Sequence, residues 1–325
     1  MNYDLKNIHD SKLPECVNDF INYLGTIKGK SPNTMSGYKF DLTMFFRFLK
    51  LYKGLVSSEK IFEEIDIYDI DNNFINKISL SDLYAFISFT ENYRNNGTYA
   101  RARKVATLKS FFKYAQGKVK IIDFNPASDL ESPKIDKRNP IYLTLDESKT
   151  LLKSITGKNK QRDYCIITLF LNCGLRLSEL CSIDLPKIRE DTITIIGKGN
   201  KERTIYLNHA CLKSLATYLP ERNSNANIID IDALFISRSN RRINKRTVEL
   251  LVKKYIKFAD LDYDKFTPHK LRHTAATLMY KYGNVDIRSL QKILGHENIS
   301  TTQIYTHVDD EQLREAVKAN PLSEE

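Results

Sequence analysis

The sequence lacks the features that would assign it to a membrane or to the cell exterior. It has no apolar run near the ~20 residues that a bilayer span requires. Its start, MNYDLKNIHDSKLPE, lacks the basic segment and apolar core of a secretory signal. Its five cysteines contain no C-x-x-C pair, which favours neither a disulfide framework nor a zinc site. We therefore expect a cytoplasmic protein without membrane contact, whose cysteines are reduced and mostly buried.

The composition indicates a folded protein with surplus positive charge. The chain has 325 residues, 42% of them hydrophobic, which is enough for a substantial core and suggests two domains. Lysine and arginine total 50 against 40 acidic residues, giving a net charge of +10. This excess favours a polyanionic partner but does not identify it, because basic residues are more often solvated surface than binding site.

The first half of the chain is predicted to be helical. Apolar side chains recur at three- and four-residue steps over residues 31–52, 79–95 and 98–116. An acidic stretch, Glu59 to Asp71, lies between the first two of these helices and resembles an insertion near residues 52–76. Three prolines within 126–140 predict an extended linker over residues 119–140, where we place the domain boundary.

The second half is predicted to be a mixed, mostly helical domain. Thr144 and Glu147 have the spacing of a capping box, and Gly174 suits a left-handed end of the next helix. The segment TITIIGKGNKERTIYL, residues 192–207, predicts two strands joined by a glycine-bounded turn. The predicted fold class is thus mainly α with a small β-sheet.

Histidines gather near the end of the chain, where four of the six lie between residues 269 and 307. Thr267 as cap, Pro268 as first residue and Gly283 as end predict a helix. On it His269 and Arg272 are three apart and share a face, which we expect to lie opposite the buried stripe.

The stretch LGHENISTTQIYTHV is predicted to form a helix end, a turn and a new helix. Gly295 ends the first helix, and Ser300 to Gln303 has the spacing of a capping box. His296 then lies near the end of one helix and Tyr305 about one turn into the next. Both side chains could converge on one point, although a single tyrosine is more often half-buried packing.

Together these segments resemble the tyrosine recombinases, the phage integrase family. The motifs are GLRLSEL with Arg176, GKGNKER with Lys198, HKLRH with His269 and Arg272, LGH with His296, and TTQIYTHV with Tyr305. They match the six positions of the family's active site in order, and the resemblance extends over residues 14–320. It implies a two-domain clamp: a helical core-binding domain (14–118), the linker, a mixed α/β catalytic domain (141–310) and a C-terminal tail helix (311–325).

The resemblance also implies a mechanism. Tyr305 would attack a DNA phosphate and form a 3′-phosphotyrosine, while Arg176 and Arg272 stabilise the charge on the phosphate oxygens. His296 would add a hydrogen bond, and His269 would help to deprotonate Tyr305. Lys198 would protonate the leaving 5′ oxygen, with Lys201 as the rival for that role.

The remaining residues of these motifs are expected to support the six. His273 and His307 would be supporting or structural, and Glu179 would order the segment that carries Arg176. We expect no metal and no cofactor, because the reaction exchanges one phosphate ester for another.

Duplex DNA is the expected partner, and the contacts to its phosphates are expected from basic residues in both domains. The alternative for each of them is ordinary solvated charge. The expected contacts are Lys39, Arg101, Arg103, Lys104, Arg241, Arg242, Lys245 and Arg246. The family further implies a homo-tetramer on paired sites, formed from a monomer or dimer per site and linked by the tail.

Several functions share this chemistry. Fewer than twenty residues precede the expected core-binding domain, so we expect no arm-binding domain. This expectation favours an Xer-like recombinase that resolves chromosome dimers, with an FtsK-type translocase as a candidate activator. A DNA-inversion recombinase or a compact mobile-element integrase is the alternative, and a type IB topoisomerase fits this domain order less well. From another class, a catalytically silent DNA-binding regulator remains, against which the complete set of six argues.

Overall fold

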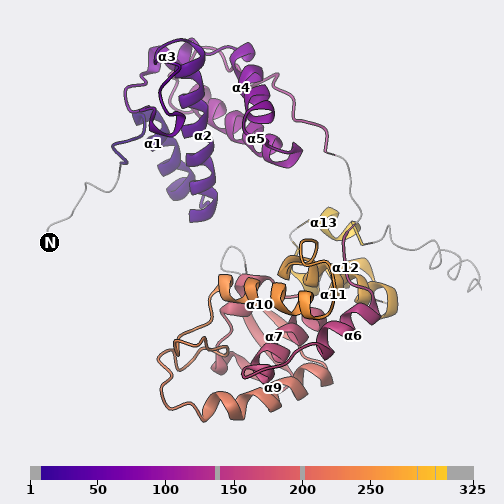
Figure 1. Cartoon of the computed structure of the whole chain (residues 1–325). Helices are drawn as coiled ribbons and strands as arrows, with labels where there is room; N and C mark the ends of the chain where they lie inside the picture. Colours follow the sequence, from indigo (N-terminus) through magenta and orange to yellow (C-terminus); the bar gives the residue numbers. More distant parts are fainter. Residues whose placement is uncertain (1–8, 136–139, 198–201, 284, 297, 306–325) are drawn as a thin grey trace, which may run out of the picture. The chain divides into compact units, whose positions relative to one another are not determined.

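A computed structural model of the chain describes residues 9–135, 140–197, 202–283, 285–296 and 298–305. The chain divides into two compact units, Met1–Lys137 and Arg138–Glu325. Both are built mainly from helices, and the second also contains a small sheet (Figure 1). The mainly α fold with a small sheet is confirmed. Among the described residues, no helix has both the length and the apolar character needed to cross a bilayer.

The first unit is a bundle of helices around an aromatic core. Its elements are α1 (Glu15–Asn22), the π-helix η2 (Tyr23–Ile27), α2 (Pro32–Tyr52), the 3-10 helix η3 (Phe62–Glu64), α3 (Asn72–Asn76), α4 (Leu80–Asn92) and α5 (Thr98–Gly117). Ser31 caps α2 by accepting from the Thr34 amide, and Pro32 occupies its first turn. α2, α4 and α5 pack on one another (Figure 1), and fully buried phenylalanines fill the space between them.

The acidic stretch is an integral part of this unit, although the sequence did not reveal its contribution. Ile65, Ile67 and Ile70 are buried in the core. Asp69 pairs with Lys50 of α2 at 2.7 Å, so the charges of this stretch neutralise a largely buried lysine. The stretch therefore covers one side of α2.

The predicted linker is also partly structural. Ile122, Ala127 and Leu130 are buried in the core of the first unit. These apolar side chains dock on the bundle, whereas the described residues 119–135 form no helix or strand and the division between the units falls within the predicted linker.

The second unit packs several helices against one another, with α7 in contact with four of them. Its helices are α6 (Leu145–Lys153), α7 (Lys160–Cys173), α8 (Leu177–Cys181), the 3-10 helix η4 (Leu185–Lys187), α9 (His209–Asn223), α10 (Lys245–Phe258), α11 (Pro268–Tyr282), α12 (Ile287–Leu294) and α13 (Ser300–Gln303). α7 packs against α9 and α11. The capping box of Thr144 and Glu147 at the start of α6 is confirmed.

The sheet has one strand more than predicted. β1 (Ile188–Arg189), β2 (Thr192–Ile196) and β3 (Glu202–Tyr206) are antiparallel in the order β1-β2-β3. Thr192 pairs with Tyr206 and Ile196 with Glu202. The two-residue β1 was missed because so short a strand has no alternation to detect.

Two glycines fix the turns that surround the candidate site. Gly174 ends α7 at φ +59° and Gly295 ends α12 at φ +64°, as predicted for left-handed caps. A Cβ on Gly174 would lie 2.7 Å from Leu294, and one on Gly295 would lie 2.9 Å from Arg203. These caps therefore allow α7, α12 and β3 to approach one another closely.

All five cysteines are free and buried, as expected. Thr267, Pro268 and Gly283 occupy the N-cap, first-turn and C-cap positions of α11 as predicted, but two predicted capping contacts are absent. Thr267 makes no capping hydrogen bond to α11, and α13 begins after Ile299 without a capping box.

Candidate active site

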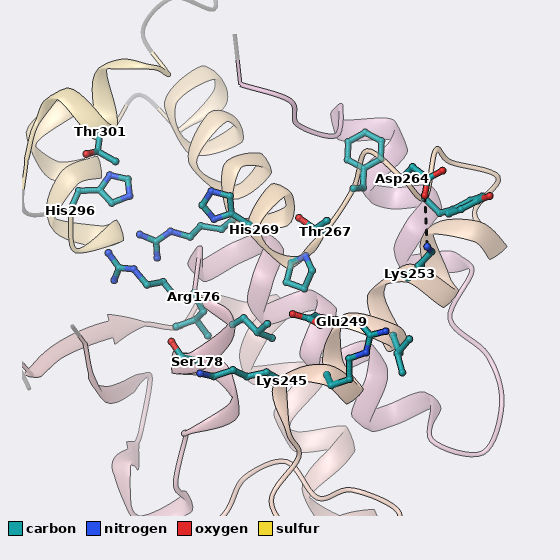
Figure 2. Close-up of a pocket in the computed structure, with 18 residues that line it drawn as sticks. Arg176, Ser178, Lys245, Glu249, Lys253, Asp264, Thr267, His269, His296 and Thr301 are labelled. Atoms are coloured by element: carbon teal, nitrogen blue, oxygen red, sulfur yellow. Dashed lines mark hydrogen bonds and ion pairs between the residues drawn. The ribbon is translucent and has the colours of Figure 1, made fainter. Parts of the chain in front are cut away.

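A pocket of about 960 Å³ opens in the second unit between the start of α8, α10, α11 and the segment after α12. Four of the six expected catalytic residues line it: Arg176, His269, Arg272 and His296. Figure 2 shows Arg176, His269 and His296 pointing toward one another. Residues that are up to 120 positions apart in the sequence thus meet in one cavity.

Arg176 is held at the start of α8 by a local carboxylate. Its Nη1 donates to Glu179 Oε1 and its backbone amide donates to Glu179 Oε2, both at 2.7 Å. Its Nη2 donates to the carbonyl of Gly295 at 2.8 Å. The expectation that Glu179 orders this segment agrees with these contacts.

Arg272 is enclosed more completely than the sequence suggested. The expectation that it lies opposite the core was wrong, because it is only 3% exposed. Its Nη1 donates to the carbonyl of Gly174 (2.7 Å) and its Nη2 to that of Leu294 (2.6 Å). The α7 and α12 ends that provide these carbonyls could not be placed beside α11 by sequence spacing. Burial, with Arg176 as the next cause, lowers the pKa of Arg272 to about 10.

The buried carboxylate of Glu179 lies within ion-pair distance of three guanidinium groups. Glu179 contacts Arg176, lies 2.9 Å from Arg203 Nη2 and lies 3.7 Å from Arg272 Nη1. Burial acts to raise the pKa of Glu179, but the charges of Arg203 and Arg176 outweigh it and hold the pKa below its usual value. The pocket wall therefore carries more positive than negative charge.

Arg203 was missed by the sequence analysis although it lies within GKGNKER. It links Glu179 to the carbonyl of Ile293, so that β3 is tied to the end of α12. Its partners lie 24 and 90 residues away, and no local pattern marks such a contact.

His296 is oriented by the segment that leads to Tyr305. Its Nδ1 is 2.9 Å from the Thr302 hydroxyl. Burial lowers the pKa of His296 to about 4, and Arg272 and Arg176 act in the same direction. Its ring is therefore neutral at pH 7 and can donate one N–H into the pocket.

Tyr305 is buried next to a histidine that was not among the six. Its side chain is 1% exposed and packs with Ala276, Leu290 and Leu294. Its hydroxyl is 2.7 Å from His273 Nδ1, and His273 Nε2 is 3.1 Å from His269 Nε2. The sequence analysis expected His269 to act on Tyr305 directly, but the structure places His273 between them.

Three expected or rival residues cannot be compared with the site. Lys198, Lys201 and His307 lie outside the described residues. Within the described ranges, no group of three or more histidine, cysteine, aspartate or glutamate side chains could hold a metal ion.

The basic residues of the first unit are engaged with carboxylates. Lys39 pairs with Asp10, Arg101 with Glu91, and Arg103 with Asp41. Lys104 is 2% exposed and faces the buried Asp41 at 3.3 Å. The expectation that Lys104 contacts DNA was wrong, because its ammonium group is enclosed by α2 and α5.

The basic residues of the second unit differ in exposure. Arg242 donates to the carbonyls of Cys181 and Ile183 and pairs with Asp184 at 2.5 Å, so it is tied to the fold. Arg241 is exposed, whereas Lys245 and Arg246 line the pocket itself.

Comparison with known proteins identifies the family of this chain. Residues 142–312 match the model of the phage integrase family. The chain is 59% identical over 314 residues to the tyrosine recombinase XerC of Caldanaerobacter subterraneus subsp. tengcongensis, covering 97% of this chain and 89% of the relative. It is 36% identical to XerC of Thermodesulfovibrio yellowstonii, covering 95% and 97%. The chain belongs to the phage integrase family and is an Xer-like, site-specific tyrosine recombinase.

Solved structures share this fold. XerH recombinase bound to a palindromic difH substrate, in a post-cleavage complex, has a TM-score of 0.69 at 20% identity, covering 96% of this chain and 98% of that chain. The Tn1549 transposon integrase in complex with transposon right end DNA has a TM-score of 0.68 at 20% identity, covering 93% and 98%.

Proposed function

We propose that this recombinase cuts and rejoins duplex DNA through a 3′-phosphotyrosine at Tyr305, and that it resolves chromosome dimers. The observation that carries the proposal is the meeting of Arg176, Arg272, His269 and His296 in one pocket, with the Tyr305 hydroxyl two hydrogen bonds away from it. Action on the chromosome places the protein in the cytoplasm.

The two pocket arginines suit a phosphodiester in the transition state. Attack on phosphorus adds negative charge to the non-bridging oxygens, and donors fixed in advance lower the barrier most. Arg176 and Arg272 are fixed by Glu179 and by backbone carbonyls. Because each guanidinium has five N–H donors, some remain for the phosphate after these bonds are made.

The other residues complete the reaction. His296 donates a further hydrogen bond to a phosphate oxygen, and Lys198 protonates the departing 5′ oxygen. Neither step requires a metal or a cofactor, because one ester replaces another.

DNA binding and assembly follow the family plan in this proposal. The first unit is the core-binding domain, and the two units close as a clamp on duplex DNA. Lys245 and Arg246 at the pocket, with Arg241, Lys39, Arg101 and Arg103, contact phosphates. The tail (311–325), which lies outside the described residues, links four protomers on paired sites, and an FtsK-type translocase acts as an activator.

A nicked duplex tests the chemistry. When the cleavage point lies close to a nick, the short product diffuses away and the enzyme stays covalently attached to DNA. We expect the adduct with the native chain, and for Tyr305→Phe we expect DNA binding without an adduct. A Tyr305→Phe variant that still forms the adduct would contradict the proposal.

DNA inversion or mobile-element integration is the competing role within this chemistry. The XerC relatives favour the chromosomal role. Sequencing the DNA that is crosslinked to the protein in its native cells distinguishes them. One site near the replication terminus supports dimer resolution, whereas invertible repeats or element ends would contradict it.

A further inference from the structure

The hydroxyl of Tyr305 contacts His273, which is not one of the six expected catalytic residues. His273 Nδ1 lies 2.7 Å from this oxygen, which is a short hydrogen bond. On the other side of the ring, His273 Nε2 lies 3.1 Å from His269 Nε2. The two imidazoles meet edge to face with centroids 4.5 Å apart. A chain of two hydrogen bonds thus leads from the buried phenol to His269, which lines the pocket.

The hydrogen-bond roles in this chain follow from the direction of the first bond. If Tyr305 donates its O–H to His273 Nδ1, that nitrogen carries no proton, and a neutral His273 then carries it on Nε2. This Nε2–H points at His269 Nε2, which must accept and is therefore also unprotonated. The arrangement is self-consistent with both rings neutral.

Resting on the proposed function, we propose that His273 removes the proton from Tyr305 and relays a proton to His269. The Tyr305 O–H bond breaks and a His273 Nδ1–H bond forms, while the His273 Nε2–H bond breaks and a His269 Nε2–H bond forms. The phenolic oxygen uses the freed electron pair to form the bond to phosphorus, and the 5′ oxygen leaves with a proton from Lys198. His273 ends neutral in its other tautomer, and His269 ends as the cation.

The surroundings of the relay favour neutral rings before the reaction. Burial lowers the pKa of His273 to about 3, and burial also lowers that of His269. The charged or titratable groups that face His273 are Tyr305, His269, Lys270, Arg272 and His296. Burial raises the pKa of Tyr305 to about 12, so this phenol needs a base in direct contact.

A relay also explains why a buried nucleophile needs two histidines. A proton left on His273 would be a charge in an apolar surrounding beside Arg272, which is unfavourable. Passing it to His269 places the charge at the pocket, beside the DNA phosphate. The second imidazole therefore moves the positive charge to where an anion binds.

His273→Asn separates this role from simple support of Tyr305. The asparagine oxygen can accept the phenol hydrogen bond near the position of Nδ1, but it cannot pass a proton on. On a nicked duplex we expect single-turnover cleavage at pH 7 to fall about 10²-fold. The defect should shrink by about tenfold per pH unit between pH 7 and 9, because hydroxide then takes the proton. His209→Asn, an exposed histidine change on α9, is the matched control and should leave cleavage unchanged.

A DNA substrate with sulfur in place of the bridging 5′ oxygen needs no general acid, because a thiolate leaves without a proton. The cleavage rate on this substrate therefore tests only the deprotonation of Tyr305. On this substrate Lys198→Ala should recover and His273→Asn should not. His273→Asn within threefold of the native rate, or slower by the same factor at every pH, overturns the relay. Failure of the proposed function appears separately, as an adduct that survives Tyr305→Phe.

If His273→Asn folds poorly, the native enzyme supplies the test. With the sulfur substrate, its cleavage rate is measured in mixtures of water and D₂O. Two protons in motion give a curved dependence on the deuterium fraction, which we expect. A straight line means one moving proton and overturns the relay.

Discussion

The two units of the chain differ in how their buried charged side chains are paired. In the first, Lys50 pairs with Asp69, Lys53 with Asp82, and Asp41 faces Arg103 and Lys104. In the second, Glu179 alone contacts three arginines, and Arg272 relies on backbone carbonyls for its other contacts. Nearly balanced charges in the first unit are typical of a scaffold, whereas the concentrated positive charge of the second is suited to an anion. The difference agrees with the proposal that the reaction takes place in the second unit.

Exchanging cations of the same charge should affect the two units unequally. For Arg272→Lys we expect single-turnover cleavage to lose about 3 kcal/mol of barrier lowering, because an ammonium cannot hold both carbonyls and a phosphate as the guanidinium fork does. Lys53→Arg in the first unit keeps its pair with Asp82 and should leave the rate unchanged. If Arg272→Lys cleaved DNA at a rate within threefold of the native chain, the expected contrast between the two units would be contradicted.

Neutralising the shared carboxylate should destabilise the second unit more than an equivalent change destabilises the first. Glu179→Gln leaves buried arginines without their counter-charge, and we expect a loss of about 3 kcal/mol in the free energy of unfolding. Asp82→Asn weakens a capping box and a pair with the partly exposed Lys53, for which we expect about 1 kcal/mol. Urea unfolding measures both, and equal losses would contradict the comparison.

Two glycines with nearly equal backbone angles provide a matched pair. Gly174 has φ +59° and Gly29 has φ +58°, but a Cβ would meet Leu294 at 2.7 Å only at Gly174. Gly29→Ala should cost about 1 kcal/mol for the left-handed conformation alone. Gly174→Ala should cost roughly 1–3 kcal/mol more in thermal unfolding and should lower cleavage, because it displaces the carbonyl that holds Arg272. Equal losses of unfolding free energy for Gly29→Ala and Gly174→Ala would show that α7 and α12 are not closely packed at Gly174.

Acid should weaken the second unit before the first. His296 and His273 have pKa values near 4 and 3 when folded, below the usual 6.5, so the unfolded chain binds more protons. Their stabilising contribution is complete above pH 6.5 and is lost as the pH falls toward 4. In the first unit, the pKa values of Asp69 and Asp82 are lowered from 3.8, so their contribution is lost only below about that pH. Hydrogen exchange at pH 5 should report faster opening in the second unit, and faster opening in the first would contradict this order.

What the sequence predicted follows from how local each signal is. The capping box at Thr144 and the left-handed ends at Gly174 and Gly295 depend on a few neighbouring residues and are confirmed. The family motifs were also evident, and the comparisons confirm the family.

The misses depend on contacts between distant segments. Lys104 follows Arg101 and Arg103 in a basic segment of the helix and was expected at the surface, but it is buried against Asp41 of another helix. His269 and His273 lie four residues apart on one helix, and only the packing of the segment after α12 decides which of them contacts Tyr305. Sequence periodicity predicts the face of a helix but not what covers it.

The most direct test of the account is to identify the amino acid that becomes linked to DNA. The adduct trapped on a nicked duplex can be digested and sequenced by mass spectrometry. We predict a single modified peptide with the nucleotide on Tyr305. Attachment at any other residue, or cleavage with no protein attached, would contradict the account.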